Sequence, residues 1–497
     1  TAIREATGMM TRREVLTAAA AAPAILRGQR RAGDQPNILF LWTDEQRPDT
    51  FAAYGNTRFR MPVLNRLARE SVVFDRHYVT QPVCTPSRSS ILTGLWPHQN
   101  GCLNNNIALR PDTPTLPELM GGHSYRTAYM GKWHLGDEVF AQHGFDHWVS
   151  IEDGYQRWYG PGRDPEAVSS YHRWLVSLGY TPPNGRRFPR DWAVRRTVEH
   201  CKPAFLAGEA SRFILESRAN PWLLSVNFLE PHMPFFGPYN DLHSEEEAPV
   251  PANYPGGTMQ PEPEAYRKKR QGFWEKGFER HDLKTRTGWQ RLNRNYAGLC
   301  TQVDQALGRI LWALESSGQM ENTLIVFTSD HGEMMGAHGL VGKSVMYEEA
   351  MRVPLLVRAP FRRQAPGRVM RPTSSIDLVP TILDLVGRKP SAPVSGHSLV
   401  DLMNGGAHPE SYVFSQWNSE SANDPNARTV IAPEGLKLVL HDRDHSFLTD
   451  RRADPLETTN LLGRRERAGD ATRLKKELER WMRQQKDPLL EGNLLGR

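Results

Sequence analysis

Four short runs of apolar residues recur along the chain, and each ends in polar side chains. They cover residues 37–42, 125–130, 222–228 and 324–328. Continuous apolar runs of this length, separated by helix-length segments, are typical of parallel strands buried on both faces. The pattern therefore predicts an α/β protein with a large mixed, mostly parallel sheet that is sandwiched by helices.

A long amphipathic helix is predicted between the third and fourth runs. Residues 291–317 place Leu292, Tyr296, Leu299 and Val303 at three- and four-residue steps, which is the spacing of a helix face that packs on a core. Shorter helices are expected at 62–69 and 375–386, and further strands at 72–74 and 351–358.

The pattern of predicted secondary structure changes after about residue 396. Strand candidates there are short and separated by Gly or Asp turns, and a charged helix is expected at about 465–485. We predict a leader at 1–34, an α/β domain at 35–395 and a small antiparallel C-terminal subdomain at 396–497. The short strands are expected at 411–417, 428–432, 436–441 and 446–448.

Two irregular segments interrupt the α/β pattern. Residues 151–220 are rich in Trp and Tyr, and residues 235–290 combine frequent Pro and Gly with a charged stretch. Such segments often shape a binding pocket and carry its specificity. They also fit a purely packing role, and the sequence leaves both interpretations open.

The N-terminal segment is typical of an export signal. Arg12 and Arg13 precede an apolar run of 12 residues from Val15 to Leu26, which is too short to cross a bilayer. Paired arginines before such a run are typical of a Tat leader, although a short amphipathic surface helix is the alternative. We expect a periplasmic or secreted protein without stable membrane insertion, since no later run has 18 apolar residues.

Charge and cysteine content exclude several classes of protein. The net charge of +6 falls to +3 without the six arginines and three acids of residues 1–34. No dense basic run is interleaved with aromatics, so a nucleic-acid partner is not expected. Cys84, Cys102, Cys201 and Cys300 form no CxxC pair, which argues against a structural zinc site. If Cys84 does not pair, the other three cysteines allow at most one disulfide.

The polar residues that follow the four strands predict a metal site. Carboxyl ends of parallel strands meet at one edge of a sheet, where ligands gather. Oxygen-rich ligation suits Ca²⁺ or Mg²⁺, and a histidine shifts the preference towards Mn²⁺ or Zn²⁺. The predicted ligands are Asp44 and Glu45 after the first strand, and Asp330 and His331 after the fourth.

Cations and histidines are expected around this metal. Arginine and lysine side chains beside a metal indicate an anionic substrate group. Two histidines can act as acid and base near neutral pH. Sulfuryl or phosphoryl transfer fits this set, whereas peptide hydrolysis fits poorly. The residues are Arg88, Lys132, His134, His232 and Lys343.

The segment from Cys84 to Gly94 reads C-T-P-S-R-S-S-I-L-T-G. It resembles the signature of type I sulfatases, in which the cysteine is converted to formylglycine. Other motifs resemble that family in the same order across about residues 36–462. They are G-K-W-H-L-G at 131–136, P-H-M-P at 231–234, S-D-H-G at 329–332 and G-A-H-G-L at 336–340 with Lys343.

The resemblance implies a role for each site residue. Asp44, Glu45, Asp330 and His331 would hold a divalent cation, preferably Ca²⁺, together with the modified Cys84. Arg88 and Lys132 would neutralise the formylglycine oxygen and the sulfate. His232 and Lys343 would protonate the leaving group, and His134 would take a proton from the second hydroxyl of the hydrated aldehyde, which expels sulfate. A helix beginning at Pro86 would direct its N–H groups at the anion.

The implied reaction is hydrolysis of a sulfated carbohydrate or another sulfated metabolite, after a maturation enzyme has converted Cys84. Two positions depart from the family pattern: Glu45 stands where Asp is common, and His331 where some members have Asn. A phosphonate monoester or phosphodiester hydrolase of the alkaline-phosphatase-like superfamily is the alternative. A non-catalytic binder of sulfated glycans would require an unmodified Cys84.

Overall fold

The computed structural model describes residues 35–497 apart from 123, 257–258, 363, 420, 422–423, 493 and 497. The predicted leader at 1–34 lies outside the described residues. Residues Pro36–Arg497 form one compact unit. None of the helices in the described part of the chain combines the length and apolar composition that a membrane span requires.

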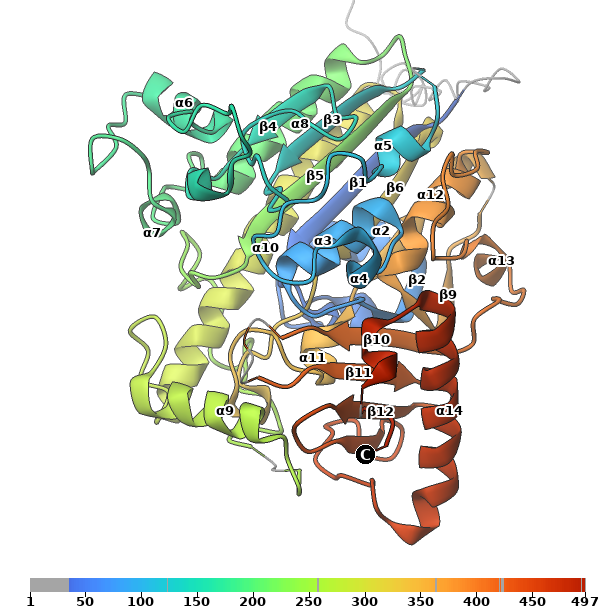
Figure 1. The fold of residues 1–497 in the computed structure, drawn as a ribbon. Helices are drawn as coiled ribbons and strands as arrows, with labels where there is room; N and C mark the ends of the chain where they lie inside the picture. Colours follow the sequence, from blue (N-terminus) through green and yellow to red (C-terminus); the bar gives the residue numbers. More distant parts are fainter. Residues whose placement is uncertain are drawn as a thin grey trace, which may run out of the picture. The chain divides into compact units, whose positions relative to one another are not determined.

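The main sheet has nine strands in the described part of the chain, and β1 (Asn37–Asp44) lies at its centre (Figure 1). β5 (Trp222–Pro231) and β6 (Thr323–Ser329) pair with β1 in parallel on either side. β3 (Arg126–Gly131) and β4 (His147–Ser150) continue the parallel half beyond β5. The four apolar runs of the sequence are therefore neighbouring parallel strands, as predicted.

The other half of the sheet mixes strand directions. β8 (Leu355–Arg358) runs antiparallel to β6 and to β2 (Val72–Tyr78). β7 (Arg352–Val353) also runs antiparallel to β2, whereas β9 (Gly367–Ser374) pairs with β2 in parallel. Two successive reversals leave β2 parallel to β1, so the chain leaves β2 at the same sheet edge and enters the segment with Cys84. The predicted mixed, mostly parallel sheet is confirmed.

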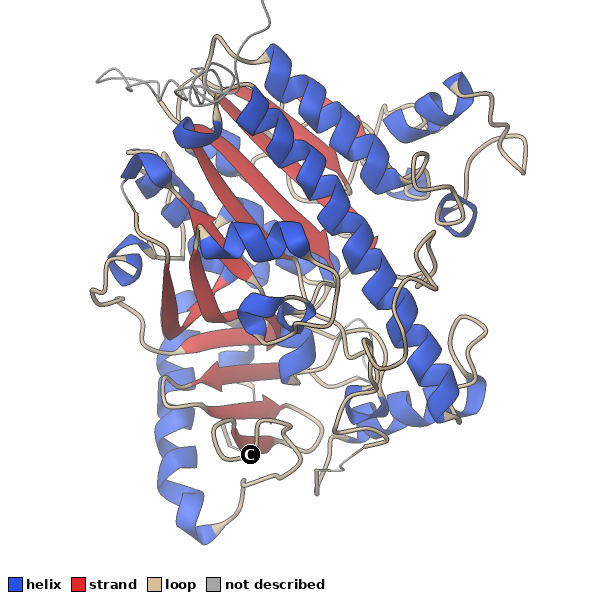
Figure 2. Cartoon of the chain, turned by 180° about the vertical axis from the view of Figure 1, so that it is seen from behind, coloured by secondary structure: helices blue, strands red, loops and turns tan. Residues whose placement is uncertain are grey.

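Helices cover both faces of the sheet because β1 is apolar on both. Leu39 and Leu41 pack into one core and Phe40 into the other. α8 (Lys202–Glu216) and α10 (Arg286–Ser316) cover the first face, seen from behind in Figure 2. The second face is covered by α3 (Cys84–Thr93), α5 (Leu116–Leu119) and α12 (Leu378–Leu385). In the described part of the chain, the remaining α-helices are α2 (Pro62–Arg69), α4 (Pro97–Asn100), α6 (Ser170–Ser177), α7 (Arg190–Ala193), α9 (Glu264–Lys276), α11 (Glu348–Met351), α13 (Val400–Met403) and α14 (Ala468–Gln485).

The C-terminal part forms a separate antiparallel sheet of four strands, as predicted. α14 packs on it, with the Trp481 ring stacked on Phe414 at 5.1 Å between centroids. The sheets change between β9 and β10, but a domain boundary at residue 396 stays a prediction. The strands are β10 (Val413–Trp417), β11 (Ala427–Ile431), β12 (Leu436–His441) and β13 (Phe447–Asp450).

The starts of α3 and α10 differ from the sequence prediction. α3 begins at Cys84 and not at Pro86, and the Ser87 N–H donates to the Val83 carbonyl at 3.1 Å. Proline is tolerated inside this first turn because N–H groups there have no partner within the helix. α10 begins at Arg286, where the Thr285 side chain caps it.

Candidate active site

The carboxyl ends of the central strands bring four predicted ligands together. Asp44 ends β1, while Asp330 and His331 follow β6. Cys84 starts α3 on the second face of the sheet. Ligand atoms of these four buried residues all lie within 4.8 Å of one another. The fold therefore brings residues that are up to 287 positions apart in the sequence into one cluster, as the polar strand ends predict.

Arg88 holds the two acids of this cluster. Its side chain is completely buried, and it forms ion pairs with Asp44 at 2.7 Å and Asp330 at 2.9 Å. The same guanidinium donates to the Lys132 carbonyl at 2.8 Å and to Asn227 Oδ1 at 2.7 Å. Arg88 lies one helical turn after Cys84, so α3 supplies both the sulfur and the cation that fixes the carboxylates.

Cys84 lies among charged groups. Its Sγ is 3.2 Å from His331 Nε2, 3.7 Å from Lys132 Nζ and 3.8 Å from Asp44 Oδ1. Burial, followed by the Asp44 charge, raises the pKa of this thiol far above its ordinary range. Because the thiolate is the reactive form of cysteine, the unmodified side chain is a poor nucleophile in this environment.

The donor set fits a divalent cation. The Nδ1 of His331 lies 2.9 Å from the Gly332 carbonyl and donates to it, which leaves the Nε2 lone pair facing the cluster. Asp44 and Asp330 provide carboxylate oxygens. Glu45 belongs to a second, overlapping group with Asp44 and His232, and its buried Oε2 has no hydrogen-bond partner. Two carboxylates, a third nearby and one free imidazole nitrogen match hard divalent ions.

Lys343 and His232 form a proton-transfer pair beside the cluster. The Nδ1 of His232 donates to the Met233 carbonyl at 2.5 Å, so its Nε2 can accept from Lys343 Nζ at 3.1 Å. Lys343 is also ion-paired with Glu45. Burial lowers the pKa of Lys343 to about 8, which leaves its ammonium group able to give up a proton near neutral pH.

His134 is held as a neutral base. Its Nε2 lies 2.9 Å from Asn106 Oδ1 and donates to it, and its buried Nδ1 has no hydrogen-bond partner. Burial, and then the charges of Lys132 and Arg88, keep the pKa of His134 well below its ordinary value. Glu138 accepts from the His134 main-chain N–H at 2.7 Å and fixes this turn, in which His134 has a φ of 60°.

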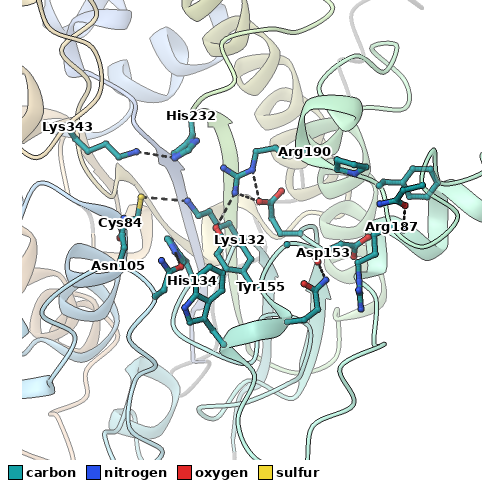
Figure 3. A pocket seen from close by; sticks show the side chains of 18 residues that line it. Cys84, Asn105, Lys132, His134, Asp153, Tyr155, Arg187, Arg190, His232 and Lys343 are labelled. Carbon is teal, nitrogen blue, oxygen red and sulfur yellow. Dashed lines mark hydrogen bonds and ion pairs between the residues drawn. The ribbon is translucent and has the colours of Figure 1, made fainter. Parts of the chain in front are cut away.

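These groups meet at the inner end of a pocket of about 650 Å³ (Figure 3). Cys84, Lys132, His134, His232 and Lys343 line that inner end. Arg88 is outside the lining, behind the carboxylates that it holds. The outer wall comes from the irregular segment 151–220, and its lining side chains include Glu152, Asp153, Tyr155, Trp158, Arg187, Phe188 and Arg190.

Several polar residues around the site were not predicted from the sequence. Asn106 orients His134, Asn227 accepts from Arg88, and Glu138 holds the turn after β3. Asn227 stands within the third apolar run, where a buried polar residue needs a partner, and that signal could have identified it. Asn106 lies in a segment without periodicity and gives no such signal.

Comparison with known proteins agrees with this geometry. A family model described as Sulfatase matches residues 36–388, and one described as N-sulphoglucosamine sulphohydrolase, C-terminal, matches residues 336–485. The chain belongs to the sulfatase family. It is therefore a sulfuric ester hydrolase with an alkaline-phosphatase-like fold, and the predicted family and enzyme class are confirmed.

Individual relatives are similar over nearly the whole chain. The N-acetylglucosamine-6-O-sulfatase of Bacteroides thetaiotaomicron is 28% identical over 506 residues, covering 92% of this chain and 88% of the relative. The phosphonate monoester hydrolase SpPMH of Silicibacter pomeroyi has a TM-score of 0.77 and 26% identity, covering 92% and 97% of the two chains. BT4656, solved with its substrate D-glucosamine-2-N,6-O-disulfate, has a TM-score of 0.73 and 25% identity, covering 91% and 99%.

Proposed function

We propose that this sulfatase hydrolyses sulfate esters of carbohydrates, with a formylglycine made from Cys84 as its nucleophile and a bound divalent cation. The observation that carries the proposal is the setting of Cys84. Its sulfur lies at the inner end of the pocket, between His331 at 3.2 Å and Lys132 at 3.7 Å. The pKa of the thiol is raised there, so an unmodified cysteine would be a weak nucleophile at the position where the reaction needs a strong one.

The acids around Cys84 would hold the cation. Asp44, Asp330 and His331 would provide ligands from one group, and Glu45 would extend it with its unpartnered Oε2. Carboxylate oxygens dominate this set, so we propose Ca²⁺. A bound cation of this kind lowers the pKa of an oxygen nucleophile and polarises the group under attack.

Positive charge would then stabilise the sulfate as it is transferred. Lys132 Nζ lies next to Cys84 and forms an ion pair with Asp44 at 2.5 Å. Arg88 would act one layer further back, since it is buried against the two ligand carboxylates. The expected contribution of N–H groups from the first turn of α3 is not found, because the Thr85 N–H donates to Asn105 Oδ1 and the Ser87 N–H donates to the Val83 carbonyl, while proline has no N–H.

Two separate groups would move protons. Lys343, hydrogen-bonded to His232, would protonate the departing alcohol, because its lowered pKa favours proton release. His134 would accept a proton during release of sulfate through its Nδ1, which has no other partner. His134 and the Lys343–His232 pair both line the inner end of the pocket, so the acid and the base need not be the same residue.

A panel of sulfated mono- and disaccharides, with 4-nitrophenyl sulfate as a simple aryl ester, tests this proposal. We expect sulfate release that depends on Cys84 and is lost in Cys84→Ala. The proposal would be contradicted if purified wild-type protein that carries the aldehyde hydrolysed none of these sulfate esters.

Phosphonate monoester hydrolysis is the second candidate, and one observation favours it. Of the two solved relatives described above, the phosphonate monoester hydrolase has the higher TM-score, 0.77 against 0.73. The same cation cluster could stabilise a phosphonate ester, because both reactions transfer a group with charged oxygens. Comparing kcat/KM for matched aryl sulfate and aryl phosphonate esters separates them, and a much faster phosphonate reaction would replace our assignment.

We also propose that the protein is matured before export to the periplasm or the cell exterior. Support comes from Arg12 and Arg13 before the apolar run at residues 15–26. Tat substrates usually fold before transport, so a maturation enzyme would have to convert Cys84 in the cytoplasm. Replacing both arginines with lysine should retain active enzyme in the cytoplasmic fraction. Unchanged export of that variant would refute the Tat assignment.

A further inference from the structure

The outer wall of the pocket carries two arginines that the proposed chemistry leaves without a role. Arg187 and Arg190 come from the loop before α7 and the first residue of that helix. In Figure 3, Arg187 lies across the pocket from Cys84, and Arg190 is drawn between them, next to Tyr155. Lys132 lies beside Cys84, and the ligand carboxylates there would hold the proposed cation, so the sulfate that reacts at Cys84 is already provided with positive charge.

Arg190 is held rigidly by its neighbours. Its Nε donates to Glu152 Oε2 at 2.8 Å, and its Nη2 donates to the Tyr155 hydroxyl at 3.1 Å. The buried Lys202 forms an ion pair with the same Glu152. One carboxylate therefore faces two cations, so these three side chains together carry one net positive charge. The carboxyl group of Glu230 also interacts with both cations, and burial raises its pKa to about 7. Within the described residues, Arg190 Nη1 has no hydrogen-bond partner, and the side chain is 28% exposed.

Tyr155 connects Arg190 to the catalytic end of the pocket. The centroid of its ring is 4.9 Å from the centroid of the His134 ring, and its hydroxyl accepts from Arg190. Arg190 therefore lies about one tyrosine side chain away from His134. This is a distance that a substituent on the same sugar, or on the next sugar, can span.

Arg187 adds a second positive charge to the wall. Its Nε is buried without a hydrogen-bond partner, and its Nη2 donates to the Pro165 carbonyl. Among the described residues its ion-pair partner is Glu166, at 3.9 Å, and that carboxylate is 73% exposed. An exposed pair at this distance contributes little, so the charge of Arg187 is largely available to a ligand.

We propose that Arg187 and Arg190 bind a second anionic group of the substrate, on the part that leaves as the alcohol. The inference rests on the proposed function and narrows it to sugars that carry a further sulfate or carboxylate on the same or the adjacent unit. Arginine suits this role because its planar fork matches the oxygens of sulfate and carboxylate. The pocket volume of about 650 Å³ lies in the range of sites that hold a whole small ligand and not only a sulfate group.

Matched pairs of substrates that differ in one anionic group test the proposal. One pair is N-sulfoglucosamine 6-sulfate and N-acetylglucosamine 6-sulfate. In the other pairs, a sulfated disaccharide that contains a uronic acid is compared with the same disaccharide after its carboxyl group has been reduced to an alcohol. We expect the doubly anionic member of at least one pair to have a kcat/KM about tenfold higher or more, as for a partly exposed charge-assisted contact.

Variants assign the preference to the wall. Arg187→Gln should reduce the ratio of the two kcat/KM values by about tenfold, and Arg190→Gln should do the same. The neighbouring Arg186 is exposed and lies outside the pocket lining, so Arg186→Gln should leave both the ratio and the activity unchanged. If Arg190→Gln does not fold because Glu152 loses a partner, Arg187→Gln decides alone.

The outcomes separate this inference from the proposed function. Hydrolysis of 4-nitrophenyl sulfate without any preference for the doubly anionic members would overturn the second-anion site and leave the sulfatase reaction standing. An equal ratio in Arg187→Gln and Arg186→Gln would overturn it as well. If the wild-type protein with formylglycine hydrolyses no sulfate ester, both proposals fail.

Discussion

Replacing Arg88 removes the buried cation that forms ion pairs with both ligand carboxylates, Asp44 and Asp330. In Arg88→Gln, Asp44 and Asp330 lose ion pairs of 2.7 and 2.9 Å in a place without solvent. Asp44 keeps its ion pair with Lys132 at 2.5 Å, so the charge left without Arg88 is that of Asp330. Breaking a buried ion pair by removing one partner costs about 3–5 kcal/mol, because the remaining charge is uncompensated. We expect the free energy of unfolding to fall by about that amount when divalent cations are chelated.

Two further variants show whether charge or geometry matters. Arg88→Lys keeps the charge but lacks the guanidinium fork that reaches both acids. Its free energy of unfolding should therefore lie between those of the wild type and Arg88→Gln. Arg66→Gln is a matched surface control: Arg66 pairs with Glu315 at 2.9 Å, but their side chains are 41% and 39% exposed. A screened surface pair contributes about 0–1 kcal/mol, so this variant should unfold almost like wild type.

Equilibrium urea denaturation, in chelator and then in saturating Ca²⁺, measures these differences. A bound cation supplies positive charge to the same carboxylates, so the deficit of Arg88→Gln should shrink when Ca²⁺ is present. The reasoning is refuted if Arg88→Gln lies within about 1 kcal/mol of wild type in chelator, the value expected for a surface pair.

Three other predictions concern the proton-transfer groups and the cation. Asn106→Asp places a carboxylate beside His134 Nε2, which stabilises the imidazolium and raises the pKa of His134. Because His134 would act in sulfate release, after the alcohol has left, the acid limb of kcat should move to higher pH by about 1–3 pH units for an aryl sulfate whose turnover is limited by sulfate release; an unmoved limb would exclude His134 as the base. Lys343→Met should lower kcat/KM by about 100-fold or more for alkyl sulfates, and far less for aryl sulfates, whose acidic leaving groups need no proton. Equal losses of kcat/KM for both series would exclude Lys343 as the general acid. Chelation of divalent cations should abolish turnover and lower the midpoint of thermal unfolding. Adding Ca²⁺ at about 100 times its Kd should raise the free energy of unfolding by about 2.7 kcal/mol. Full activity in chelator would exclude a catalytic cation.

The framework of the site was predictable because it follows from strand periodicity. Apolar runs that end in Asp44 and Asp330 read as buried parallel strands, and parallel strands end at one edge. The antiparallel C-terminal sheet was equally visible from short strands and turn residues. The start of α3 was not, since a proline suggests a helix start but is also tolerated two residues inside one.

The partners of the site residues could not be predicted, because they depend on tertiary contacts. Arg88 was expected to act on the sulfate, but its side chain is occupied by two acids from β1 and the residue after β6. That arrangement requires the relative placement of α3 and the sheet, which no local pattern encodes. The outer wall with Arg187 and Arg190 comes from a segment without periodicity, and the sequence left its role undecided between pocket and packing.

The chemical state of Cys84 tests the central claim most directly. Trypsin releases this residue in peptide 77–88, and its mass can be measured in protein from the native host alongside hydrolysis of an aryl sulfate. The account predicts that the active protein carries the aldehyde form and that activity scales with the fraction converted. A fully active preparation in which the peptide retains an unaltered thiol would contradict it.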